Sequence, residues 1–176
     1  MLKGIKNKFK RKAAVKFLND NKNKRIACSR VEKGIAKVGC IVDLDNVPDG
    51  TIFNEFIKEF SLQPNALKII GYKAEHDKNS PYSTPVFSEE DLGWGAKIEN
   101  SYALEFLDNE YDMLISYYTE ENLLLQLMTM QSKARLKVGF GEIDENLNDL
   151  ILNIPNKDFS IFKNELRKYL SVLNEI

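Results

Sequence analysis

The sequence predicts an α/β protein with a mainly parallel, Rossmann-like sheet of about five strands and helices on both faces, preceded by a basic amphipathic helix. Strand-like apolar segments alternate with segments of helical periodicity along the chain, a pattern typical of right-handed βαβ crossovers. The 43% hydrophobic and 29% charged content is that of an ordinary globular protein. The charge is divided unevenly along the chain, and this sets the N-terminal helix apart.

The first 25 residues predict a separate helical arm. An apolar stripe at spacings of three and four, the periodicity of one helix face, is formed by Leu2, Ile5, Phe9, Ala13 and Phe17. Residues 1–25 contain ten of the 25 Lys and Arg residues but only one of the 26 acidic residues, so this segment has a formal charge of +9 and the remainder has −10. We therefore expect a basic amphipathic arm over residues 1–25 and a single α/β domain over residues 26–176.

The first half of the domain is expected to supply two strands and one helix. Residues 25–31 form a short strand or a connector, and residues 37–44 (KVGCIVDL) form a buried strand that ends in the turn 45–50. A helix capped by Thr51 follows and stops at Pro64. The next strand covers residues 66–72, and a long polar loop covers residues 73–95.

The second half is expected to complete the alternation. Helices are predicted at 99–109 and 119–132, and strands at 111–117, 135–140 and 150–154. Asp158 is expected to cap a terminal helix. Cys28 and Cys40 lie in apolar stretches without a CxxC motif, and the chain has one histidine, so we interpret both cysteines as small hydrophobic residues and expect no structural zinc site.

Three runs of sequence carry a resemblance to a known family. They are VFSEEDLGWGAKIEN (86–100), YDMLISYYTEENLLLQLMTMQSKARLKVGF (111–140) and LNDLILNI (147–154). From about residue 37 onwards the chain resembles a family of bacterial proteins of unknown function, which implies no activity. Residues 111–140 are also similar, more weakly, to the N-terminal half of heptosyltransferase-like proteins. That similarity implies a Rossmann-like fold, but those enzymes need a second nucleotide-sugar-binding domain for which this chain has no room.

The run IVDLDNV (41–47) resembles the DxDx[TV] motif of haloacid-dehalogenase-type phosphatases. The resemblance implies a magnesium-dependent phosphohydrolase in which Asp43 attacks phosphorus and Asp45 acts as acid and base. The resemblance further implies that Ser116 stands in the second motif of these enzymes, Lys133 or Lys137 in the third, and Asp144 with Asp149 in the fourth. The competing interpretation is a solvated turn that caps the helix after Thr51. Outside this alternative we expect no metal and no cofactor.

The basic arm predicts a non-enzymatic binding or adaptor module. The expected binding residues are Lys3, Lys6, Lys8, Lys10, Arg11, Lys12 and Lys16, with Trp94, whose flanking glycines suit an aromatic that docks on a partner, folds back as a lid, or packs over the sheet edge. Collected charges of one sign predict an anionic neighbour: the ribosome or other RNA, an anionic membrane surface, an acidic protein, or the protein's own acidic body with Ile5, Phe9 and Phe17 packed inward. No transmembrane segment is expected, and the predicted location is cytoplasmic or peripheral to the membrane.

Overall fold

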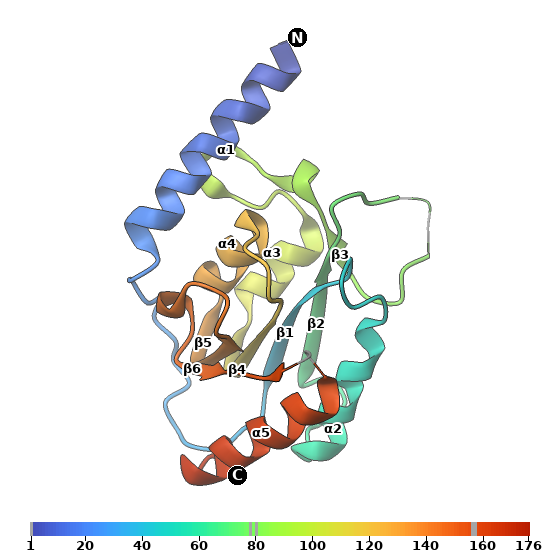
Figure 1. Cartoon of the computed structure of the whole chain (residues 1–176), viewed down its shortest axis with the longest axis vertical. Helices are drawn as coiled ribbons and strands as arrows, with labels where there is room; N and C mark the ends of the chain where they lie inside the picture. The colour runs from blue at the N-terminus through green and yellow to red at the C-terminus, as the bar shows by residue number, and fades with distance from the viewer. Residues whose placement is uncertain (1, 78, 80, 156–157) are drawn as a thin grey trace.

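The computed structural model describes residues 2–77, 79, 81–155 and 158–176, with side chains from residue 4 onwards. A parallel sheet runs through the molecule in the order β3-β2-β1-β4-β5-β6 (Figure 1). Its strands are β1 (Val38–Asp43), β2 (Leu67–Tyr72), β3 (Val86–Phe87), β4 (Glu110–Tyr117), β5 (Lys133–Phe140) and β6 (Leu150–Leu152). This order is typical of Rossmann-type sheets and has its switch point between β1 and β4. The predicted fold class is confirmed, with six strands instead of about five.

Helices cover both faces of this sheet, because its central strands are apolar on both sides. All six residues of β1 are buried, so the strand needs an apolar layer above and below it. One face is covered by α1 (Leu2–Asn21), α3 (Ser101–Asp108) and α4 (Leu123–Gln131), and the other by the 3-10 helix η1 (Gly50–Asn54), α2 (Glu55–Glu59) and α5 (Phe159–Val172). Cys40 is buried among the residues of the second face, as a small apolar side chain.

Side-chain caps begin several of these helices. The side chains of Asn100 and Asn122 accept backbone N–H groups at the starts of α3 and α4, and Asp158 caps α5 as predicted. The residue predicted to cap the helix after β1, Thr51, is wrong. Asp49, not Thr51, is the cap, and its Oδ1 accepts both the backbone N–H (2.8 Å) and the hydroxyl (2.6 Å) of Thr51. The helical segment therefore begins two residues earlier than predicted, as η1.

The stretch 73–95, predicted as one long loop, contains the edge strand and two 3-10 turns. β3 pairs with β2 at only two positions, which is too short for a period of two to be visible in the sequence. It is followed by η2 (Glu89–Asp91) and η3 (Trp94–Ala96). Asp91 accepts the backbone N–H of Ser88 at 2.8 Å, which fixes the start of η2 and so the place of Glu89.

The segment between α1 and β1 is a connector, the second of the two predicted alternatives for residues 25–31. It is tied to β4 through the bidentate pair of Arg30 with Asp112, at 2.6 and 2.8 Å. The Asp112 carboxylate also accepts the backbone N–H groups of Ala36 and Lys37, at 2.9 and 2.8 Å. One buried carboxylate therefore positions the chain entering β1.

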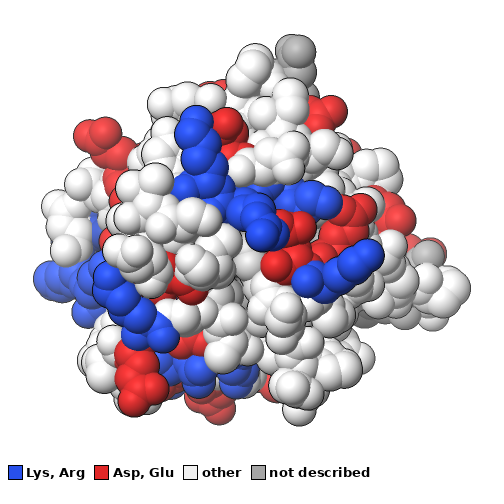
Figure 2. Space-filling model, turned by 90° about the horizontal axis from the view of Figure 1, so that it is seen from below, with Lys and Arg blue, Asp and Glu red and all other residues white. Residues whose placement is uncertain are grey.

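One face of the protein, the lower one in the view of Figure 1, has charged side chains of both signs. Basic and acidic side chains are interspersed on this face (Figure 2). Near it, α5 and α2 are joined by Lys163 with Glu55 (2.7 Å) and Arg167 with Glu59 (2.5 Å). Within the described residues, no helix combines the length and apolar character that crossing a bilayer requires.

Candidate functional site

Helix α1 is held on the body by a narrow apolar contact. Ala14 and Leu18 are its buried hydrophobic residues, 0% and 7% exposed, and both belong to the core cluster that includes α4. The helix contacts α4 and η3, while its N-terminal end projects past the rest of the molecule (Figure 1). Only the C-terminal half of α1 is therefore packed into the protein.

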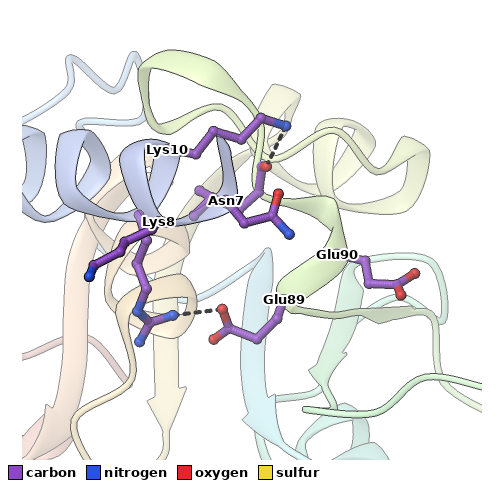
Figure 3. A pocket seen from close by; sticks show the side chains of 7 residues that line it. Asn7, Lys8, Lys10, Glu89 and Glu90 are labelled. Carbon is purple, nitrogen blue, oxygen red and sulfur yellow. Dashed lines mark hydrogen bonds and ion pairs between the residues drawn. The ribbon is translucent and has the colours of Figure 1, made fainter. Parts of the chain in front are cut away.

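Polar contacts extend this docking towards the N-terminal half. Lys10 Nζ donates to the backbone oxygen of Leu92 at 3.3 Å, and Arg11 pairs with Glu89 at 2.7 Å (Figure 3). Tyr72 also donates its hydroxyl to Glu89, at 3.1 Å. At the other end of α1, Lys22 is bonded to Asp144. Two basic side chains of α1 and one directly after it thus hold the helix in place.

A cavity of about 370 Å³ lies between α1 and the turn after β3. It is lined by Asn7, Lys8, Lys10, Arg11, Glu89, Glu90 and Leu92, several of which are labelled in Figure 3. Charges of both signs line it, and Lys10 and Arg11 already bind the opposite wall. The lining has no serine, cysteine or histidine that could act as a nucleophile or proton carrier.

The apolar stripe predicted from the sequence faces away from the body. Ile5 is 49% exposed, Phe9 61% and Phe17 38%, and Ala13 is also exposed. The helix does lie on the protein's own body, as one predicted alternative has it. The residues predicted to pack inward, Ile5, Phe9 and Phe17, are wrong, because the docking residues lie on another side of the helix. The exposed stripe is accompanied by three exposed lysines, Lys6, Lys12 and Lys16.

The other predicted binding residues are divided between docking and exposure. Lys8 is exposed beside the cavity, whereas Lys10 and Arg11 are engaged with the body. The side chain of Lys3 lies outside the described residues. Trp94 is 55% exposed in η3, the segment that packs beside α1, and Gly95 next to it has a positive φ of 65° that favours glycine.

Asp43 and Asp45 are both occupied by hydrogen bonds within the protein. Asp43 is buried and accepts the backbone N–H of Asp45 at 3.0 Å and the side-chain amide of Asn46 at 2.8 Å. Asp45 turns the other way and accepts the backbone N–H of Ala74 at 2.8 Å, with Lys73 at 3.4 Å. The two carboxylates therefore organise the turn after β1 and join it to the end of β2.

The residues predicted to accompany Asp43 each have a separate role. The Ser116 hydroxyl bonds that of Thr129 in α4 at 3.0 Å, inside the core. Lys133 is the first residue of β5, whereas Asp43 is the last residue of β1, so in this parallel sheet they lie at opposite ends of the strands. Asp144 caps the short helix η4 (Glu145–Leu147) besides binding Lys22.

Asp149 and Lys137 lie together near the end of α1. Asp149 accepts the backbone N–H of Lys137 at 2.7 Å and is paired with Arg25. The Lys137 side chain is buried, and burial lowers its pKa to about 8. A small cavity of about 170 Å³ there is lined by Lys22, Lys24, Arg25 and Asp149 among others. Within the part of the chain that the structure describes, no three His, Cys, Asp or Glu side chains are grouped so that they could hold a metal ion.

The sequence predicts the helix and its apolar stripe but not the residues that dock it. Ala14 and Leu18 are four residues apart, and this short apolar pair is the signal that could have been recognised. Lys137, a buried lysine within a β-strand, has no distinguishing signal in the sequence.

Comparison with protein families gives a match over most of the chain. The sequence model of a family described as a family of unknown function (DUF6913) matches residues 6–173, which include nearly all of α1 as well as the sheet. Neither a curated protein nor a solved structure matches the chain. The similarity to heptosyltransferase-like proteins therefore stays a prediction.

Proposed function

The chain belongs to a family of unknown function (DUF6913), and from its own surface we propose that it is a binding module whose helix α1 docks on an anionic surface. The observation that carries this proposal is the side of α1 that faces away from the body. There Lys6, Lys12 and Lys16 are exposed, and within the described residues no acidic side chain pairs with them. Helix α1 is therefore docked on the body while the positive charges of these three lysines stay unpaired among the described residues.

Electrostatics favours an external partner for these lysines. Like charges gathered on one helix repel one another, by a few tenths of a kcal/mol for each neighbouring pair. An anionic surface reverses the sign: each lysine near an anionic bilayer contributes about 1 kcal/mol, and binding to RNA gains comparably from the release of counterions. The partners that fit this chemistry are an anionic membrane surface, ribosomal or other RNA, and an acidic protein. A module of this kind would work in the cytoplasm or at the periphery of a membrane and needs no cofactor.

Charge reversal on the outward side of α1 tests the proposal. In the variant K6E/K12E two of the three exposed lysines become acidic while the docking residues stay unchanged. The matched control is K58E/K168E, in which two exposed lysines of α2 and α5 are reversed, so both variants have the same formal charge. We expect K6E/K12E to elute from immobilised heparin at clearly lower salt than the control and the wild type. Equal elution of the two variants would remove the proposal.

A further inference from the structure

We propose that the anionic surface is that of a lipid bilayer, with α1 lying in its interfacial layer and the α/β body resting on the water side. This inference rests on the proposed function and adds the identity of the surface. The observation behind it is that apolar side chains are exposed on the outward side of α1. Attraction between lysines and an anionic surface does not explain their exposure.

Helical geometry separates the docking side of α1 from its apolar stripe. In an α-helix, residues nine positions apart are about 180° apart around the axis, since each residue turns the chain by about 100°. Ile5 is nine positions before Ala14, and Phe9 is nine positions before Leu18. Ala14 and Leu18 are buried against the body, whereas Ile5 and Phe9 are 49% and 61% exposed. The stripe is therefore turned outward while α1 stays docked, and it can meet a flat surface without leaving the protein.

The lysines flank this stripe as they do in interfacial helices. By the same geometry, Lys6 and Lys12 lie about 60° to either side of Phe9, and Lys16 lies about 20° from it. Their aliphatic stems can follow the apolar side chains inward while the ammonium groups stay at the headgroups. Ile5 and Phe9 therefore lie between Lys6 and Lys12, and Lys16 follows about two turns further along on the same side. Lysines beside exposed apolar side chains are found in helices that lie in the plane of a membrane.

A bilayer accounts for the exposed lysines and for Ile5 and Phe9 together, whereas RNA accounts for only part of this set. RNA binds lysines through its phosphates, and an unstacked base could stack on Phe9, but Ile5 would gain nothing from either contact. The one arginine of the segment 1–21, Arg11, is already paired with Glu89, so its guanidinium group is engaged within the protein. Burial in an acyl layer rewards both Ile5 and Phe9.

The test separates apolar insertion from charge. The variant I5S/F9S keeps every charge of the protein, and its matched control is V31S/V172S, which makes the same kind of change at two exposed valines outside α1. Binding is measured by co-sedimentation with vesicles of phosphatidylcholine containing phosphatidylglycerol, with vesicles of phosphatidylcholine alone, and on immobilised heparin. We expect I5S/F9S to bind the anionic vesicles at least about tenfold more weakly, since fully burying one such side chain is worth more than a factor of ten. The control should bind like the wild type, and all three proteins should elute together from heparin.

Each other outcome has a definite meaning. Wild-type binding to heparin without binding to anionic vesicles would overturn the bilayer inference and leave the anionic-surface function standing. Equal vesicle binding by I5S/F9S and wild type would also overturn it, because the apolar side chains would then play no part. Absence of binding to heparin and to vesicles alike would overturn the proposed function together with the inference.

Discussion

The Nζ atom of Lys137 lies 2.6 Å from the backbone oxygen of Thr129, at the C-terminal end of α4, where helix carbonyl groups have no partner within the helix. It also reaches the backbone oxygen of Met130 at 3.3 Å. A buried lysine on β5 thus caps the helix that precedes it. The arrangement satisfies the helix end, but it places a cation in the core.

Protein stability should rise with pH because of this lysine. Burial lowers the pKa of Lys137 from 10.5 to about 8 in the folded protein. Between these values the unfolded chain binds more protons than the folded one, so the free energy of unfolding increases with pH. From about pH 7 to pH 9.5 this contribution amounts to about 2 kcal/mol.

The measurement compares urea unfolding of the wild type and Lys137→Met across that range. The variant lacks the titrating group, and its loss of the two carbonyl contacts is the same at every pH. Shifts shared by both proteins, such as the raised pKa of the buried Cys40 thiol, cancel in the difference. We expect the stability of the wild type relative to the variant to grow with pH. A constant difference would mean that Lys137 is not desolvated as the structure has it.

The elements that the sequence predicts well are those whose burial is uniform along the segment. β1 and β4 are almost wholly buried, and so is the mainly apolar helix α4, so continuous apolar runs identify them. β3 could not be found, since Val86 and Phe87 become a strand only by pairing with Gly71 and Tyr72. Such pairing depends on the tertiary fold rather than on local pattern.

The docking of α1 should depend on Ala14 and not on its neighbour Ala13. Ala14 is fully buried against the body, whereas Ala13 is exposed. A carboxylate at position 14 would have to be desolvated, at a cost of several kcal/mol, and we expect Ala14→Glu to release the helix. Hydrogen exchange followed by mass spectrometry should show faster exchange in α1 for Ala14→Glu. Ala13→Glu changes the composition identically and should leave α1 protected; equal protection in the two variants would contradict the observed packing.

The candidate surface could be predicted in composition but not in orientation. Helical periodicity places Ile5, Phe9 and Ala13 on one side of α1, and an apolar stripe on a helix normally faces the core. Two side chains on the opposite side, Ala14 and Leu18, dock the helix instead. The side of α1 that packs depends on the shape of the surface that α4 and η3 form. The sequence of α1 itself does not contain this information.

Asp112 should be among the most important polar residues for stability. Its side chain is 5% exposed and bonded to Arg30 and to the backbone N–H groups of Ala36 and Lys37. Burial raises the pKa of Asp112, but these hydrogen bonds outweigh it and hold the pKa below 3.8. Its contribution is therefore present above that pH and is lost as the pH falls further.

We expect Asp112→Ala to lower the free energy of unfolding by about 2–4 kcal/mol at neutral pH, because four donor groups of three residues lose their acceptor. Urea unfolding measures the change. Asp108→Ala, at an exposed position on α3, should stay within about 0.5 kcal/mol of the wild type. A loss of equal size in both variants would show that the contacts of Asp112 are not what stabilises the chain entering β1.

Asp43 is expected to act in stability and not in phosphoryl transfer. Both of its carboxylate oxygens accept hydrogen bonds from the turn that follows β1, from Asp45 and from Asn46. Asp43→Asn replaces one acceptor oxygen by an NH2 group, so one donor loses its partner, which should cost about 1–2 kcal/mol in urea unfolding. With an aryl phosphate and Mg²⁺, we expect the wild type to release no more phosphate than Asp43→Asn. Turnover by the wild type that the substitution abolishes would instead identify Asp43 as the nucleophile implied by its DxD motif, because a loss of turn stability alone would not remove catalysis from a folded protein.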